Sequence, residues 1–295
     1  MKIGAVFPTT ELGNDPIVIR DWAQAAEELG YDHIVTFDHV LGAVHADRRP
    51  RLRGPYTDKD PFHEPMTLLA YLAGLTKKIE LATGVLILPQ RQAVLVAKQA
   101  AEIDLLSGGR FRLGVGTGWS FVEYEALGMS FEDRGKRFGE QVEVIRKLWS
   151  EPVLDYRGAH HRIDRAGMLP RPARPIPIWF GALGPIPIAR AARLGDGVIF
   201  GAGPNVTAPL LQQTQVELDK IARSREGFGS EALSDVSFGE KAWEAEFALW
   251  HKLGGTHVSL RAMDTAVELG GGKRMNYAGP QAYLDALRKF KAIVG

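Results

Sequence analysis

Two stretches decide the fold, IELATGVLILP at residues 79–89 and FRLGVGTGW at residues 111–119. Each begins as a short apolar run typical of a buried strand and then runs into glycine. Between them, Val94, Ala97 and Leu105 repeat at the spacing of one helix face. Glycine at a strand end lets the backbone come close to a flat ligand. We therefore expect two neighbouring strand ends to form one wall of a cofactor site.

The same alternation of strand and helix continues along the whole chain. Asp15 and Pro16 form the start signal of the first helix. Eight strand-then-helix units in about 250 residues favour a (β/α)8 TIM barrel over an open doubly wound sheet. We predict one α/β barrel domain over residues 1–295. The expected strands cover residues 3–7, 33–38, 79–88, 111–116, 176–180, 198–200, 233–238 and 257–263.

Two longer segments interrupt this pattern, at residues 40–63 and 153–175. The first is rich in arginine, proline and aspartate, and the second carries several prolines. Barrel enzymes build their sites from the loops that follow the strands. We therefore expect both inserts at the active face, in the loops after strands two and four.

Composition limits the classes of function. Thirty-six basic and 35 acidic residues leave a net charge of +1, and cysteine is absent. This balance indicates neither a nucleic-acid partner nor a membrane surface. Without cysteine there is no disulfide and no thiolate nucleophile or metal ligand. The apolar run at residues 3–7 is too short for a signal peptide, so we expect a cytoplasmic protein.

Asp38 and His39 end the second expected strand, a position where barrel enzymes place catalytic groups. A histidine there can exchange a proton with a reacting carbonyl near neutral pH. Asp38 is available to orient the ring, although adjacent strand residues point to opposite faces. The alternative is structural, with Asp38 as a cap and His39 as a satisfied buried group.

Glycines mark two further candidate regions. Gly114, Gly116 and Gly118 alternate, but Trp119 stands where the dinucleotide fingerprint needs its third glycine. These glycines serve either close strand packing or a planar ring lying over the strand end. The turn GALG at residues 181–184 precedes a helix, where backbone N–H groups can hold a phosphate; any tight turn, however, also favours glycine.

Other chemistries find little support. The eight histidines lack metal-ligand spacing, and His160 and His161 fall in an expected hairpin, so we expect no metal site. Ser120 has no G-x-S-x-G context, and a glycosidase would need a second carboxylate at a strand end. Tyr56, Phe62, Trp119 and Phe121 either wall a binding cavity or pack a loop onto the barrel.

Taken together, the motifs are recognisable. The chain resembles the bacterial luciferase-like superfamily over essentially its whole length, and within it the F420-dependent or flavin-dependent oxidoreductases. The motifs that carry the resemblance are DH at 38–39, TGVLILP at 83–89, KQAAEIDLLSGGR at 98–110, GVGTGW at 114–119, EYEALG at 123–128, PIPIWFG at 175–181 and GDG at 195–197.

The resemblance implies a barrel that holds F420 or FMN at the carboxyl ends of its strands. It also implies a non-proline cis peptide, here between Gly84 and Val85, against the central ring of the cofactor, and it places His39 near the reacting face. The turn at residues 181–184 corresponds to the phosphate-binding region of the family. The implied cofactor-binding residues are Phe7, Thr83, Gly84, Val85, Gly116, Thr117, Gly118, Trp119, Gly181, Ala182, Leu183, Gly184 and Gly201.

One departure matters, because Trp119 stands where the F420-dependent sugar-phosphate dehydrogenases have a glutamate. Their reaction is therefore not carried over. Two chemistries stay open on a small organic substrate: hydride transfer with F420, which we favour, and oxygenation by a monooxygenase with dioxygen and FMN that a reductase has reduced. In the first, His39 is the expected proton partner. A barrel that binds flavin without turnover is a third reading, and the relatives imply a homodimer.

Overall fold

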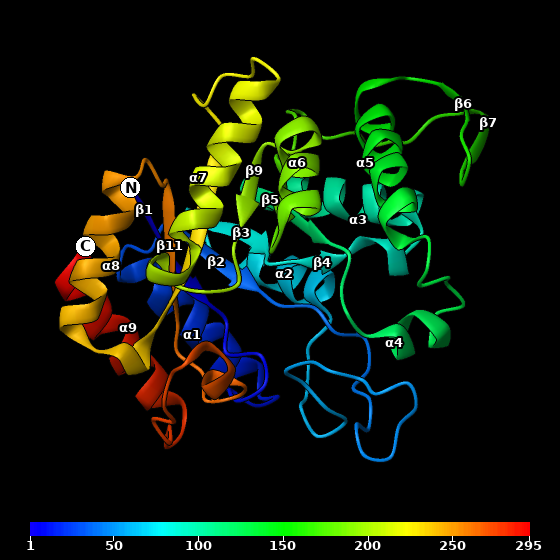
Figure 1. The fold of residues 1–295 in the computed structure, drawn as a ribbon. Helices are drawn as coiled ribbons and strands as arrows, with labels where there is room; N and C mark the ends of the chain where they lie inside the picture. Colours follow the sequence, from blue (N-terminus) through cyan, green and yellow to red (C-terminus); the bar gives the residue numbers. More distant parts are fainter.

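Eight parallel strands close into a barrel in the computed structural model, which describes residues 1–295 apart from the side chain of Leu269. The pairing runs from β3 through β2, β1, β11, β10, β9 and β8 to β5, and β5 pairs again with β3 (Figure 1). The predicted (β/α)8 barrel is confirmed. Its strands are β1 (Lys2–Val6), β2 (His33–Thr36), β3 (Glu80–Thr83), β5 (Phe111–Gly116), β8 (Ile178–Gly181), β9 (Gly197–Ile199), β10 (Gly229–Asp235) and β11 (His257–Arg261).

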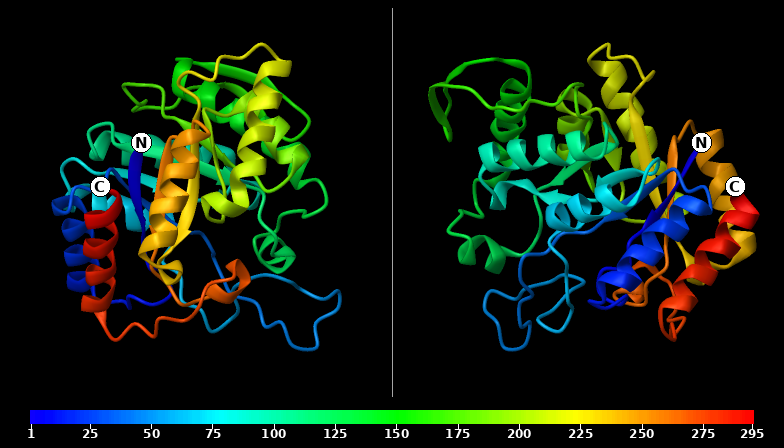
Figure 2. Two further views of the ribbon diagram at one scale, coloured as in Figure 1. Left: turned by 60° about the vertical axis from the view of Figure 1, so that its left-hand side comes forward. Right: turned by 180° about the vertical axis from the view of Figure 1, so that it is seen from behind.

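Helices cover the outside of the barrel, as the two views of Figure 2 show. Asp15 caps the first of them by accepting the N–H of Ile17, as predicted. None of the helices in the described part of the chain is long and apolar enough to cross a bilayer. The helices are α1 (Pro16–Glu28), α2 (Pro65–Leu75), α3 (Ala93–Leu106), α4 (Phe121–Ala126), α5 (Arg134–Ser150), α6 (Pro185–Leu194), α7 (Pro204–Lys220), α8 (Glu240–Lys252) and α9 (Pro280–Val294).

The third strand is broken rather than continuous. It stops at Thr83, and a two-residue strand, β4 (Leu86–Ile87), continues beside β5 after the interruption. The peptide between Gly84 and Val85 is cis, at the position that the resemblance implies. The break lies at the carboxyl end of the barrel, which is the expected place of the site.

The seventh strand lies earlier than predicted. It covers Gly229–Asp235, and the residues that follow form the short 3-10 helix η2 (Val236–Phe238). Gly229 belongs to the strand because the ring of Trp179 packs directly on its backbone: a Cβ there would come within 1.8 Å of that ring. Gly229 is therefore needed for close packing of the strand against Trp179.

The two inserts lie at opposite ends of the barrel (Figure 1). Residues 40–63 follow β2 and extend from the carboxyl ends of the strands, as expected. Residues 153–175 contain the hairpin of β6 (Leu154–Arg157) and β7 (Arg162–Ala166). This segment follows helix α5 and leads into β8, so it lies at the amino-terminal end of the strands, and our placement of it at the active face was wrong.

A buried charged cluster fills the amino-terminal end of the barrel. Glu231 accepts hydrogen bonds from Arg112 (2.8 Å) and Ser259 (2.5 Å), and its other neighbour is the His33 ring at 2.7 Å. Burial alone would raise the pKa of Glu231, but the charges of Arg112 and His33 hold it well below its ordinary value. Because the catalytic face of a barrel is at the carboxyl ends of its strands, a charged cluster at this opposite end serves stability rather than catalysis.

Candidate active site

His39 and Glu123 form a hydrogen-bonded pair at the mouth of the barrel. His39 follows β2, and its Nδ1 atom lies 2.9 Å from Oε2 of Glu123 on α4. The other carboxylate oxygen accepts the N–H of Val40 at 2.8 Å. Because a carboxylate only accepts, the His39 ring carries a proton on Nδ1 and leaves Nε2 free to exchange one.

The charge of Glu123 is fixed by these contacts. Burial raises the pKa of its carboxyl, but the hydrogen bond and charge of His39, together with the N–H groups of Val40 and Leu41, outweigh burial and lower the pKa below its ordinary value. Glu123 is therefore an anion at neutral pH and orients His39 rather than donating a proton itself. Our reading of the sequence missed Glu123, because the two side chains are 84 residues apart in the chain.

Asp38 does not take the role of orienting His39. Its carboxylate forms a bidentate ion pair with Arg91, whose Nη1 and Nη2 atoms lie 2.7 and 2.8 Å from Oδ2 and Oδ1. Oδ2 also accepts the N–H of Ile87 at 2.7 Å. Ile87 belongs to β4, directly after the cis peptide. Asp38 therefore fastens the end of β2 to the broken third strand, which is the structural alternative that the alternation of side chains left open.

Three aromatic rings surround His39. The centroids of the Phe62, Tyr56 and Trp119 rings lie 4.8, 5.2 and 5.4 Å from that of His39. Tyr56 and Phe62 come from the first insert, whereas Trp119 follows β5. Burial raises the pKa of Tyr56 to about 12, so its hydroxyl stays protonated. Phe121, the fourth predicted wall residue, packs instead against Phe131, with ring centroids 6.3 Å apart.

Partly exposed residues at the strand ends beside this group form a surface, here called the shelf. It consists of partly exposed Gly84, Val85, Thr117, Gly118, Trp119 and Gly181. The side chain of Val85 packs in the centre, where a Cβ on Gly116 would come within 2.5 Å of it and one on Gly181 within 3.2 Å. Gly116 and Gly181 thus allow close packing around Val85.

Four of the predicted cofactor residues, Phe7, Thr83, Gly116 and Ala182, are buried and are not part of the shelf. Phe7 is fully buried against Trp22, with ring centroids 5.3 Å apart, and Ala182 is also fully buried. Thr83 is buried, and its hydroxyl donates to the Gly114 carbonyl at 2.7 Å. The side chains of Phe7, Thr83 and Ala182 therefore pack in the protein interior and support the strand ends.

Comparison with known proteins places this geometry in a family. A family model described as luciferase-like monooxygenase matches residues 1–287. The chain belongs to this family. An F420-dependent glucose-6-phosphate dehydrogenase from Segniliparus rotundus is 31% identical over 241 residues, covering 78% of this chain and 68% of that protein. Pyrimidine monooxygenase RutA from a Bradyrhizobium species is 32% identical over 255 residues, covering 82% of this chain and 64% of RutA.

The fold comparison agrees. The crystal structure of monooxygenase RslO1 from Streptomyces bottropensis matches with a TM-score of 0.76 at 19% identity, covering 100% of this chain and 98% of that one. At this identity the match shows the fold alone. The first curated relatives, 36% identical over 185 residues, are matched over 64% of their own length.

The luciferase-like family implies F420 or FMN, and the residues present can be tested against such a group. The shelf offers partly exposed residues at the strand ends, where a ring could lie. At Gly184 and Gly201 nothing lies within 4 Å of the place that a Cβ would take, so the space beside both turns is open. The start of α6 at Gly184 borders this space, but Pro185 and Pro187 have no N–H and the N–H of Ile188 bonds to the Gly184 carbonyl, so only Ile186 among the first four helical residues keeps a free N–H. The partly exposed strand ends and the open space at Gly184 and Gly201 are compatible with such a group, and Ile186 supplies the one free first-turn N–H of α6.

Proposed function

We propose that this chain is an oxidoreductase that binds F420 or FMN on the shelf and a small organic substrate beside His39. The observation that carries the proposal is the placement of the His39–Glu123 pair beside Trp119 of the shelf, at the strand ends that also carry the cis peptide between Gly84 and Val85. Reduction of a carbonyl or imine by hydride transfer also requires a proton. A proton-exchanging side chain beside the surface that would support the cofactor ring is therefore suited to this reaction. The F420-dependent and monooxygenase names of the relatives support the same class of reaction.

The mechanism divides the work between cofactor and protein. When bound, reduced F420 would donate a hydride and oxidised F420 would accept one, whereas reduced FMN would supply reactivity towards dioxygen. Gly84 and Val85 would support the ring, and the start of α6 would hold its phosphate. His39 gives or takes a proton at Nε2 while Glu123 keeps the ring oriented. The rings of Tyr56, Phe62 and Trp119 exclude water from this exchange.

Trp119 bears on which reaction the site performs. Indole cannot give a proton to a reacting oxygen, so His39 is left as the proton-exchanging side chain of this group. We therefore keep F420-dependent hydride transfer as the first candidate and leave the sugar phosphates aside as substrates. FMN-dependent oxygenation is the second candidate, favoured by the likeness to RutA over 82% of the chain; it would need a reductase as partner.

The proposal extends to assembly and location. We infer one barrel domain that acts in the cytoplasm as a homodimer. Leu95 and Leu106 on α3 are 51% and 64% exposed, and they give apolar surface for such a contact. Sedimentation equilibrium would show twice the 32.4 kDa mass of the chain if the dimer forms.

Titration with the two cofactors tests the function. Purified protein is mixed with F420 and, separately, with FMN, and binding is followed by cofactor fluorescence. We expect micromolar binding of at least one of them. The His39→Ala variant should bind that cofactor with unchanged affinity but lose turnover once a substrate is found. If neither cofactor binds, the redox function is wrong; if His39→Ala loses affinity as strongly as turnover, His39 is a binding residue.

A further inference from the structure

The ring of His39, the proton-exchanging group of the candidate site, is almost completely covered. Only 9% of its side chain is exposed. The rings of Tyr56, Phe62 and Trp119 lie against it, with centroids 4.8–5.4 Å from its own. A substrate atom that exchanges a proton with Nε2 must come within hydrogen-bond distance, about 3 Å. Because the three rings occupy the space beside His39, at least one of them has to move before a substrate can bind there.

Two of these rings belong to the first insert, which is hydrogen-bonded to the barrel at its two ends. At one end, the N–H of Val40 bonds to Glu123 at 2.8 Å. At the other end, the N–H of His63 bonds to the Thr9 hydroxyl at 3.4 Å. Residues 42–56 lie between these anchors, and they form no hydrogen bond or ion pair with the barrel among the residues that the structure describes. This part of the insert is therefore held to the barrel by packing.

Residues 42–56, here called the lid, form a loop whose two ends meet. A Cβ on Gly42 would come within 2.1 Å of the Thr57 carbonyl oxygen, so the two ends pack directly on each other. The structure describes every residue of the lid, and none of them lies in a helix or strand. Compact surface loops whose ends are close are often functional. The closed base gives the lid one place about which it can turn as a unit.

Trp119 holds the lid against the barrel. Its indole packs so closely on the backbone of Gly54 that a Cβ there would lie within 2.2 Å of the ring. The ring of His45 meets the same indole edge-on, with centroids 6.1 Å apart. Gly54 and His45 belong to the lid, whereas Trp119 follows β5. The contact between Gly54 and Trp119, here called the latch, therefore fastens the lid to the barrel.

The closed position of the lid also has a cost. The Nε2 atom of His45 is buried and has no hydrogen-bond partner in the part of the chain that the structure describes. A buried polar atom without a partner costs free energy, which contact with water would recover if the lid opened. Packing on Trp119 favours closure, and hydration of His45 favours opening. These opposing terms allow both positions of the lid to be populated.

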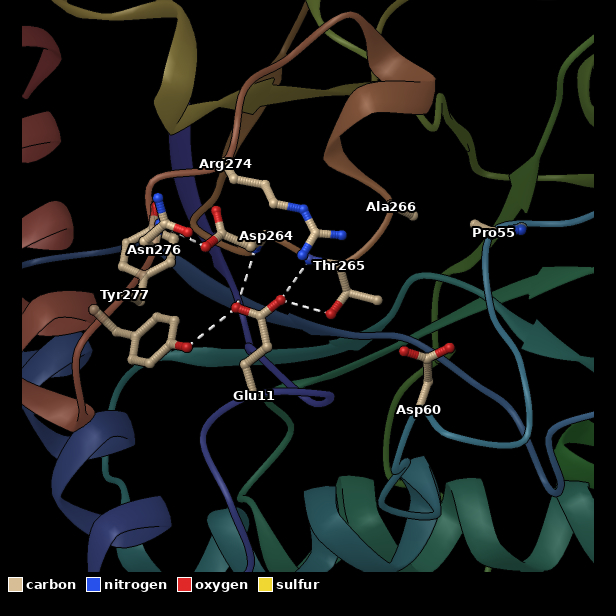
Figure 3. Close-up of a pocket in the computed structure, with 10 residues that line it drawn as sticks. Glu11, Pro55, Asp60, Asp264, Thr265, Ala266, Arg274, Asn276 and Tyr277 are labelled. Atoms are coloured by element: carbon tan, nitrogen blue, oxygen red, sulfur yellow. Dashed lines mark hydrogen bonds between the residues drawn. The ribbon is translucent and has the colours of Figure 1, made fainter.

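The lid has room to move. A polar pocket of about 570 Å³ lies beside it at the mouth of the barrel. Figure 3 shows Pro55 of the lid and Asp60 on one side of this pocket, and Asp264, which follows β11, on the other. Glu11 accepts the N–H of Asp264 at 3.0 Å and so fixes the far wall to the loop after β1. The lid can therefore turn towards the pocket without displacing a helix or strand.

We propose that the lid opens at the latch to admit a substrate to His39 and then closes over it. The role of His39 in this inference rests on the proposed oxidoreductase function. Opening draws Tyr56, the last residue of the lid, away from the His39 ring, and closure returns it. Trp119 thereby serves as the surface on which the lid is fastened. Closure of a loop over a bound substrate excludes water from the reaction.

Limited digestion with trypsin measures how often the lid opens. Trypsin cleaves after Arg51 and Arg53, which lie inside the lid. Leu52 between them is only 4% exposed, so the protease reaches these bonds when the lid leaves the barrel. The rate of cleavage then follows the population of the open form. The fragments of the full chain are identified by mass spectrometry, and cleavage outside the lid reports loss of the fold.

Gly54→Ala places a Cβ against the indole and should open the latch. The backbone of Gly54 lies outside the left-handed region, so alanine adds a clash without backbone strain. We expect cleavage in the lid to be about ten-fold faster, the effect of a moderate packing clash. Gly74→Ala is the matched control and should be cut like wild type, because Gly74 on α2 is exposed and its Cβ would meet nothing within 4 Å. Equal lid cleavage in Gly54→Ala and wild type would overturn the latch.

The Trp119→Ala variant shows whether the effect of Gly54→Ala depends on the indole. Alone, Trp119→Ala should also speed cleavage in the lid, because the lid loses the surface on which it packs. In that background Gly54→Ala should add nothing, since the ring that the new Cβ strikes is gone. An undiminished effect of Gly54→Ala without the indole would show that the clash lies elsewhere and would refute the latch.

Reaction with diethyl pyrocarbonate tests whether the lid controls access to His39. This reagent acylates exposed histidine rings, and His251 on α8 is an exposed internal reference. Relative to His251, His39 should react about ten-fold faster in Gly54→Ala than in wild type; an unchanged rate would overturn the gating role. Titration with F420 and FMN on the same samples separates the two hypotheses. If neither cofactor binds, the proposed function fails while the lid stands; if a cofactor binds and the His39 rate is unchanged, only the lid fails.

Discussion

Replacing Glu123 by glutamine should change the protonation pattern of His39. The carboxylate of Glu123 accepts bonds on both oxygens, from His39 on one side and from the N–H of Val40 on the other. An amide has one acceptor oxygen and one NH2 donor, so it can satisfy only one of these two partners. With the backbone N–H of Val40 retaining the oxygen, the NH2 group faces Nδ1 of His39. The proton of the ring is then expected to move to Nε2.

The size of the effect follows from the bond that is lost. A hydrogen bond to a charged group contributes about 1.5–3 kcal/mol, which corresponds to about a 10- to 100-fold change in the ratio of the two ring tautomers. Glu123 is only 1% exposed, so water cannot replace the lost partner. We also expect the free energy of unfolding to fall by about 2 kcal/mol.

Nitrogen NMR of the histidine rings measures the tautomer of His39 and needs no substrate. The spectrum of 15N-labelled protein distinguishes an Nδ1-protonated from an Nε2-protonated ring, and the His39→Ala variant assigns the signals. Glu125→Gln is the matched control, because Glu125 lies on the same helix and is exposed; it should leave the His39 signals unchanged. If Glu123→Gln keeps the wild-type tautomer, Glu123 does not orient His39 and the assignment of the pair is refuted.

Two further substitutions test the contacts around the site and in the barrel. Asp38→Asn breaks a buried ion pair with Arg91 and should lower the free energy of unfolding by about 3 kcal/mol in urea titrations; a change below about 0.5 kcal/mol would contradict its fastening role. Glu231 has a pKa below its unfolded value, so its stabilising effect is complete above the unfolded pKa and is lost as the pH falls through the folded one. Glu231→Gln should therefore be less stable at neutral pH and lose less stability on acidification; parallel acid profiles of variant and wild type would argue against a charged Glu231.

Local patterns were sufficient to predict the barrel. Strand β5 matched the prediction at both ends, as did helix α6 at residues 185–194, because apolar runs, glycine and proline mark these boundaries directly. Helix α2 was not predicted, since its sequence PMTLLAYLAGL is apolar on most sides and shows no helical periodicity. The second insert was misplaced because a sequence pattern does not say whether a long segment belongs to the strand or to the helix before it.

The candidate site was predicted only in part, for a different physical reason. His39 and the cis peptide at Gly84 followed from strand ends and from the resemblance, because both lie within single motifs. The partner of His39 depends on a contact across 84 residues, and the polar pocket needs side chains from both ends of the chain, Glu11 and Asp264 among them. Such contacts arise only when the barrel closes and brings β1 beside β11.

The two adjacent residues at the end of β2 link the halves of the site mechanically. Both residues follow β2, and Asp38 is bonded to Arg91 and the broken third strand, whereas His39 is bonded to Glu123. One short piece of backbone therefore sets both the position of the shelf and that of the proton-exchanging ring. A shift of this backbone would move the ring relative to the shelf, and the distance between them determines the rate of the reaction. The two carboxylates, Asp38 and Glu123, thus act together as positioning residues on either side of β2, although neither is placed to react with a substrate.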